Sequence, residues 1–337
     1  MQGVSIVIFL VCSLATNVRN FHKRHYGKVL GLLGGTSLIG PTVLGVIYKE
    51  YFRVQSNVAG YWLMLGVTNF VLSILGALLM KDYSHLVEDT TSENTTSEKE
   101  PVLPERTSAK ANEFHHLEGF ALVKNLDYQL LFWSHIISAA VGHIFIFNMI
   151  VIIESYRLDS FELPFLISMP LIIAVTKLCL GTISDSFINT IPRTLYVSIG
   201  MWLQAITILL LVIFGENKAL FVLCFIFAHV SNGLIYSVHS AYVSDFFGKE
   251  NFGINWGGIL VGDSLSDIPF MYLFGYFYDK NIEFGHSDCI GALCFQVTFQ
   301  VTFLFCGLST IFAGILISIV VYREIRWRNG TLTNKSN

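Results

Sequence analysis

The sequence predicts an all-α integral membrane protein, a helical bundle of about nine transmembrane helices. Three observations lead to this fold class. Only 13% of the 337 residues are charged, whereas soluble domains carry about 25%. The mean hydropathy is +0.59. The chain also contains nine apolar runs close to the length that a helix needs to cross about 30 Å of hydrocarbon.

The apolar runs give the expected order of the helices. They cover residues 2–18, 29–48, 58–80, 127–153, 161–180, 195–214, 219–241, 254–278 and 297–321. The first run is interpreted as a span and not as a signal peptide, because its basic cluster follows the apolar residues instead of preceding them. Glycine and proline inside several runs are typical of membrane helices.

One long polar segment, residues 81–126, separates the third run from the fourth. Its central part, HLVEDTTSENTTSEKEPVLPERTSAKANE, is acidic, rich in Ser and Thr and lacks aromatic residues. This composition predicts a disordered acidic loop. The loop divides the chain into an N-terminal part of three spans, residues 1–80, and a six-span half, residues 127–321. A polar tail, residues 322–337, follows the last span.

The distribution of Lys and Arg predicts the orientation in the membrane. Placing the loop 19–28 inside puts 15 of the 21 basic residues on the cytoplasmic side. The segments on that side are 19–28, 81–126, 181–194, 242–253 and the tail. The C-terminus is therefore expected in the cytoplasm. The membrane that holds the protein is expected to be the plasma membrane or an endomembrane. The sequons at Asn94, Asn329 and Asn334 lie on this side, so we expect none to be glycosylated.

Four segments carry a resemblance to a known family. They read VRNFHKRHYGKVLGLLGG, NMIVIIES, AYVSDFFGKENFGINWG, and GYFYDK followed by CIGALCFQVTF. In them the chain resembles the major facilitator superfamily, and within it the nodulin-like group, which is distantly related to monocarboxylate porters. The resemblance covers the chain outside the central loop. It implies a twelve-span architecture, of which the first three spans are expected to be missing here.

The resemblance also implies a function. The implied protein is a secondary transporter, or a fragment of one, which moves a small organic solute by alternating access. Monocarboxylate-like anions and proton coupling are the implied substrate class and driving force. Two alternatives stay open. One is iron- or haem-linked transport, and the other is a truncated paralogue that acts as a membrane partner without transporting.

Two acidic residues interrupt the span 254–278 near its middle. Asp263 and Asp267 are four residues apart, so they share one face of a helix. Two neighbouring carboxylates oppose each other's ionisation, which suits a proton relay. The alternative interpretation is a helix broken near Pro269, whose polar groups are satisfied by neighbouring helices.

A histidine and an asparagine in the run 127–153 are candidates for binding the solute. His143 and Asn148 are five residues apart, and Asn148 matches an asparagine of the family pattern. The alternative is an interhelical hydrogen bond worth about 0.6–2 kcal/mol. His135, nearer the membrane boundary, is expected to have a structural role. His239 is expected to pack against other helices or lie at the interface, with a role as a proton carrier as the alternative.

Lys177 is the single basic residue inside a predicted span. It either extends toward the membrane interface or attracts an anionic solute. The residues that follow, LGTISDSF, resemble the superfamily's Gly-x-x-x-Asp signature in Gly181 and Asp185. The resemblance makes these two residues candidates for a cytoplasmic gate.

The stretch YVSDFFGKENFG, residues 242–253, predicts a cytoplasmic turn between two spans. Gly248 and Gly253 are expected to let the backbone turn. Asp245 falls on the same side as Asp185, so both acids are candidates for a gate that closes in one transport state. Gly27, Gly31 and Gly35 predict a face of small residues for close helix packing.

The cysteines fall into two groups. Cys289 and Cys294 share a loop on the predicted outer side, where a disulfide is favoured over two free thiols. The other four are expected to be small core residues. They are Cys12, Cys179, Cys224 and Cys306.

No motif of an enzyme, a metal site or a cofactor site is found in the sequence, and the scattered basic residues exclude a nucleic-acid-binding face. The expected partners are the lipid bilayer, a small solute and protons. Nothing in the sequence indicates an oligomeric state.

Overall fold

The structure is a computed structural model that describes residues 2–81, 83, 120–215, 217–282 and 298–328. These residues form helices and turns, and no strand occurs among them. The long helices are α1 (Gln2–Asn20), α2 (Tyr26–Ile47), α3 (Val58–Leu79), α7 (Leu126–Phe147), α9 (Glu162–Ser186), α10 (Arg193–Phe214), α11 (Lys218–Phe247), α12 (Phe252–Lys280) and α13 (Gln300–Arg328).

Each of the nine long helices in the described part of the chain corresponds to one predicted apolar run. Seven helical segments are long and apolar enough to cross a membrane. The helices α1 and α12 are not among them, and α12 carries Asp263 and Asp267 in its middle. The fold is thus the predicted all-α bundle of a multi-pass membrane protein.

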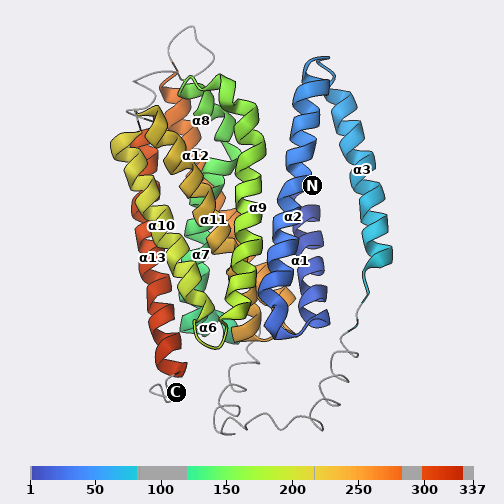
Figure 1. The fold of residues 1–337 in the computed structure, drawn as a ribbon, viewed down its shortest axis with the longest axis vertical. Coiled ribbons are helices and arrows are strands. Elements are labelled where there is room, and N and C mark those ends of the chain that lie inside the picture. The colour runs from blue at the N-terminus through green and yellow to red at the C-terminus, as the bar shows by residue number, and fades with distance from the viewer. Residues whose placement is uncertain (1, 82, 84–119, 216, 283–297, 329–337) are drawn as a thin grey trace.

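Successive long helices run in opposite directions (Figure 1). One end of the bundle, here named the α6 end, holds α6 (Phe120–Lys124), the short helix η1 (Lys23–His25) and the last turn of α13. The opposite end, named the α8 end, holds α8 (Met149–Ser155), η2 (Tyr48–Arg53) and η3 (Asp159–Phe161). This alternation agrees with the predicted topology, and the assignment of the α6 end to the cytoplasm stays a prediction.

The small-residue face of α2 packs closely against α9. A Cβ on Gly27 would collide with the carbonyl oxygen of Gly181, and one on Gly31 would lie 2.6 Å from the carbonyl oxygen of Lys177. Gly35 continues this face one turn further along α2. The predicted glycine face is therefore confirmed, and it joins the N-terminal part of the chain to the six-span half.

The helix α3 stands apart from the bundle (Figure 1), and none of its residues is buried. At the α8 end, the Tyr61 hydroxyl lies 3.5 Å from the Leu44 carbonyl, and its ring packs on Tyr48. At the α6 end, the Asn20 amide donates to the carbonyl of Lys81 at 2.8 Å. Contacts at its two ends hold α3, while its apolar sides are left for lipid.

The apolar core forms two clusters, one toward each end of the bundle. The cluster at the α8 end includes Ile144, Phe225 and Phe303, and each of these is fully buried. The cluster at the α6 end includes Phe252 and Trp256 from the start of α12. The polar residues of the candidate site lie between these two clusters.

The predicted fourth span is two helices and not one. The helix α7 ends at Phe147, and α8 follows after Asn148. The Asn148 side-chain amide donates to the carbonyl of Ile144 at 3.1 Å, a local bond that competes with regular helix hydrogen bonding. By contrast, α12 continues through Pro269 without ending there.

The turn between α11 and α12 needs one left-handed residue. Gly248 supplies it with φ of 88°, as expected for a glycine that ends a helix. The predicted turn role of Gly253 is wrong. This residue lies in the first turn of α12, where a Cβ would be 3.5 Å from Cβ of Ala15 in α1.

The cysteine predictions hold for two residues out of four. Cys224 and Cys306 are buried, whereas Cys12 and Cys179 are exposed, so the core prediction was wrong for the latter pair. In a membrane helix an apolar side chain packs equally well against lipid, and apolar character alone does not distinguish the two surroundings. Cys289, Cys294 and the three sequons lie outside the described residues.

Candidate functional site

A cavity of about 260 Å³ lies between α1 and α2 on one side and α7, α9, α11 and α12 on the other. Most of its wall is apolar. Its charged and hydrogen-bonding groups include Ser37, His143, Lys177, Tyr236, Asp263 and Asp267. An apolar pocket with a few convergent polar groups is the usual form of a small-molecule site.

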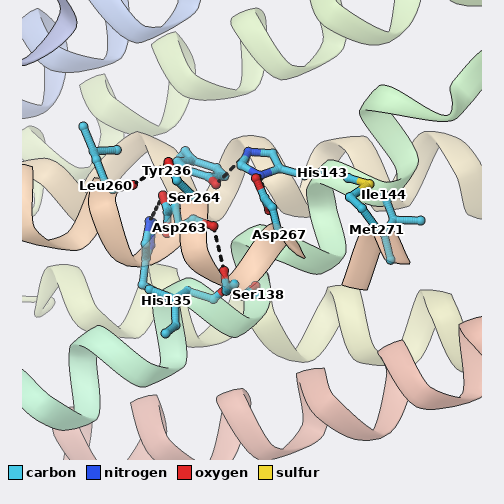
Figure 2. Close-up of polar contacts among 12 residues, drawn as sticks. His135, Ser138, His143, Ile144, Tyr236, Leu260, Asp263, Ser264, Asp267 and Met271 are labelled. Carbon is cyan, nitrogen blue, oxygen red and sulfur yellow. Dashed lines mark hydrogen bonds and ion pairs between the residues drawn. The ribbon is translucent and has the colours of Figure 1, made fainter. Parts of the chain in front are cut away.

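Asp267 of α12 forms a hydrogen bond with His143 of α7. The His143 Nδ1 atom lies 2.9 Å from Oδ1 and 3.0 Å from Oδ2 of the carboxylate. The other ring nitrogen lies 3.3 Å from the Tyr236 hydroxyl, so the imidazole bridges the acid and the phenol. Figure 2 shows the three side chains turned toward one another at the cavity wall.

Asp263 pairs with a different histidine, His135, one turn nearer the α6 end. The His135 Nε2 atom lies 3.2 Å from Oδ2 of Asp263, below it in Figure 2. On its other side, His135 Nδ1 lies 3.0 Å from Nδ1 of His239 in α11. Both imidazoles are fully buried. The two acids predicted as a pair therefore have separate histidine partners.

Lys177 projects from α9 into the cavity wall. Its ammonium donates to the carbonyl of Gly34 in α2 at 3.2 Å and lies 5.2 Å from the centre of the Tyr236 ring. Among the described residues no carboxylate forms an ion pair with it within 4 Å. Of the two sequence interpretations, this position favours a cation that faces the cavity over one that extends to the membrane interface.

Asn148 lies outside the group of residues that line the cavity. Its amide donates to the Ile144 carbonyl and lies 3.4 Å from Sδ of Met271. Figure 2 shows Ile144 and Met271 together at one side of the His143–Asp267 pair. The structure therefore brings His143 to the cavity but leaves its predicted companion at the junction of α7 and α8.

A second charged cluster lies at the α6 end. Asp185, at the end of α9, accepts backbone N–H bonds from Gly27 at 2.9 Å and Lys28 at 2.8 Å. These are free donors in the first turn of α2, where the helix dipole favours an anion. Arg193, at the start of α10, bridges Asp185 and Asp245 with its two terminal nitrogens. The cluster thus ties α2 to α9, α10 and α11.

The α8 end carries its own ion pairs between the same two helical segments. Glu162, at the start of α9, lies 2.9 Å from the Lys49 ammonium and 3.5 Å from the Arg53 guanidinium. Both bases belong to η2, which continues α2. Charged contacts therefore hold the α2–α9 interface at each of its ends.

Four residues of these clusters were missed or underrated by the sequence predictions. Arg193 and Tyr236 were not named. His135 was expected to be structural, and for His239 packing was preferred over a role as a proton carrier. One signal was available, because His135 and His143 are eight residues apart and so share a helical face. No pattern in α10 or α11 indicated Arg193 or Tyr236, whose partners come from other helices.

The described side chains do not gather around a metal. No group of three His, Cys, Asp or Glu residues among them is placed to hold an ion. His135, His239 and Asp263 are bonded in a line, with His135 in the middle, and do not surround a common point.

Comparison with protein families agrees with this fold. The chain matches the Major Facilitator Superfamily profile over residues 1–266, which include α1 to α3 and most of the six-span half. It therefore belongs to the major facilitator superfamily, whose members are membrane transporters and not enzymes. No curated protein matches the chain.

Proposed function

We propose that the chain is a proton-linked transporter of a small monocarboxylate-like anion, of the nodulin-like and monocarboxylate-porter-like group, which works by alternating access. The observation that carries this proposal is Lys177. It is a cation on the wall of a mostly apolar cavity, without a carboxylate partner among the described residues. An anionic solute would supply that partner, and the apolar wall would take its carbon chain.

The charges of the cavity favour proton coupling. Two carboxylates, Asp263 and Asp267, face the same space as the single ammonium of Lys177. An anion that enters brings a further negative charge into surroundings of low dielectric constant, which is costly. Uptake of one proton by an acid–histidine pair offsets that charge. The solute and the proton would then bind together more favourably than the solute alone.

The cluster at the α6 end serves as the gate in this proposal, on the cytoplasmic side. Alternating access requires the α2–α9 contact to open at one end while it stays closed at the other. Asp185 holds the first turn of α2, and Arg193 holds Asp185 to Asp245. Gly181 permits the close helix contact, and Gly248 the turn that positions Asp245.

Uptake into proteoliposomes tests the proposal. The full chain is reconstituted, and accumulation of labelled L-lactate or pyruvate is measured under an inward proton gradient. Wild-type protein should accumulate at least one of the two anions. Lys177→Met should reduce uptake to the level of protein-free liposomes, because the cavity loses its cation.

Lys218→Met is the matched control, since Lys218 is exposed at the start of α11 and away from the cavity. It should transport like the wild type. Wild-type vesicles that take up neither anion, or a Lys177→Met variant with normal uptake, would contradict the proposed function.

A further inference from the structure

Three buried side chains from three helices form one hydrogen-bonded line. His239 of α11 contacts His135 of α7 through their Nδ1 atoms at 3.0 Å, and His135 contacts Asp263 of α12 through Nε2 at 3.2 Å. Both imidazoles are fully buried and Asp263 is 5% exposed. The line thus connects the cavity wall to a side chain deep in α11.

The short contact between two ring nitrogens fixes how the protons are arranged. Two Nδ1 atoms at this distance share one proton, since one ring donates and the other accepts. If Asp263 is ionised and accepts from His135 Nε2–H, the Nδ1 atom of His135 carries a lone pair. His239 then donates its Nδ1–H to that lone pair. The Nε2 atom of His239 is left as the acceptor at the end of the line.

At each end of this line, one atom that can accept a proton has no hydrogen-bond partner among the described residues. Asp263 lines the cavity, and its Oδ1 atom has no hydrogen-bond partner among the described residues. His239 Nε2 is buried and also lacks one. The side-chain amide of Asn255, in the first turn of α12, is also buried and has no hydrogen-bond partner among the described residues. Buried polar atoms of this kind are those that ordered water satisfies.

We propose that His239 and His135 relay a proton between the α6 end of the bundle and Asp263 on the cavity wall. His239 takes a proton on Nε2 and passes its Nδ1 proton to Nδ1 of His135. His135 then passes its Nε2 proton to Oδ2 of Asp263. One proton is moved, both rings end neutral, and the carboxylate ends protonated. The relay deepens the proposed function, because it gives proton-linked transport a path to one side of the membrane.

Other titratable groups face this line from the neighbouring helices. The Tyr236 ring of α11 lies 5.1 Å from the ring of His135. Asp267 and His143 form their own pair one turn along α12, and Lys177 of α9 lies beyond Tyr236. Their bonds are separate from the line, so a change at His239 leaves them in place.

Infrared spectroscopy of the full chain in lipid bilayers tests the relay without any solute. The carbonyl band of protonated Asp263 is identified by its loss in Asp263→Asn, and its appearance is followed in time after a fast pH drop. His239→Asn keeps an amide that donates to His135 but cannot pass a proton on. It should slow protonation of Asp263 by roughly 100-fold, the scale of a lost acid–base group.

His229→Asn is the matched control, because His229 is also buried in α11 but, within the described part of the chain, its ring bonds only to the Phe225 carbonyl. It should protonate Asp263 at the wild-type rate. If His239→Asn protonates at that rate too, or if no wild-type band depends on Asp263, the relay is disproved. If His239→Asn does not fold, His135→Asn is measured in its place with the same expectation. Neither result depends on solute uptake, so the relay and the proposed function fail separately.

Discussion

Arg193 carries a buried charge at the α6 end of the bundle. It is 1% exposed and has carboxylates on both sides, Asp185 and Asp245. A buried ion pair gives little net stability compared with apolar residues of similar size. Removal of one partner is costly, because an uncompensated charge then stays buried. The fork shape of the guanidinium lets one side chain serve two acids.

Replacement of this residue should destabilise the protein. We expect Arg193→Ala to lower the free energy of unfolding by about 3–5 kcal/mol, with Arg193→Lys in between, because an ammonium cannot hold both acids in the same geometry. Thermal unfolding of purified protein in detergent measures the effect. Lys28→Met is the control, because its exposed side chain is lost while its backbone bond to Asp185 remains. An Arg193→Ala variant as stable as this control would contradict the assigned role.

Asp263 is where proton coupling should be visible. In Asp263→Asn the carboxylate can no longer take a proton, so an inward acid gradient should no longer accelerate uptake of the anion. Wild-type uptake should rise as the external pH falls. Asp279→Asn, exposed at the end of the same helix, should keep the wild-type response. Initial uptake rates with and without the gradient measure this, and a gradient response that survives in Asp263→Asn would exclude Asp263 as the coupling residue.

Residues could be predicted from the sequence where they break a local rule. Asp263 and Asp267 were recognisable because acids are costly in an apolar span. Their histidine partners were not recognisable, because the pairing depends on how α7, α11 and α12 pack. Arg193 was missed for the same reason, since a lone arginine at a helix start is common and its two acids lie on other helices.

Among the elements, the contact of α2 with α9 has the tightest geometry. A Cβ on Gly181 would collide with the backbone carbonyl of Gly27, which cannot rotate away as a side chain would. The same interface brings Lys177 to the carbonyl of Gly34. Close packing of the two helices therefore also sets the position of the cavity cation.

Enlarging that glycine should force the helices apart. Gly181→Ala is expected to cost about 1–3 kcal/mol of stability, the usual cost of overpacking. Gly275→Ala is the control on α12, because no atom outside its own stretch of helix lies within 4 Å of its added Cβ. It should be neutral or stabilising by about 0.5–1 kcal/mol, since alanine is the better helix former. Thermal unfolding compares the two, and equal stability of both variants would refute the close contact.

The long helices were predictable because each needs an apolar run of a length set by the bilayer. The end of α7 at Asn148 was not predictable, since a single asparagine within a continuous apolar run is a weak stop signal. The turn glycine at 248 followed from its place after an apolar run. Gly253 lies in the same polar stretch of the sequence and was therefore also predicted to be in the turn, but it packs against α1.

At the scale of the whole molecule, the cavity lies between two groups of helices, which the proposed alternating access requires to separate at one end. At the α6 end they meet where Gly253 of α12 faces Ala15 of α1. The Arg19 guanidinium of α1 also donates to the Glu250 carbonyl nearby, at 3.3 Å. The order of these helices was readable from the sequence. The solute was not, because side chains from six helices line the cavity that is proposed to bind it.

A disulfide between α1 and α12 should lock that end. The Cβ atoms at positions 15 and 253 would be 3.5 Å apart, within the range of about 3.5–4.5 Å that a disulfide needs. In a Cys12→Ser background, Ala15→Cys combined with Gly253→Cys should abolish anion uptake when oxidised and recover it with reductant. Each single variant should be insensitive to reductant. Uptake that persists in the oxidised double variant would show that this contact does not open during transport.

The most direct test of proton-linked anion transport through this cavity is the lumenal pH of proteoliposomes during solute entry. A trapped pH-sensitive dye reports the lumen when L-lactate or pyruvate is added outside. With wild-type protein, the lumen should acidify faster than in protein-free liposomes, and Lys177→Met should remove the difference. If wild-type and protein-free vesicles acidify at the same rate with both anions, the central claim is contradicted.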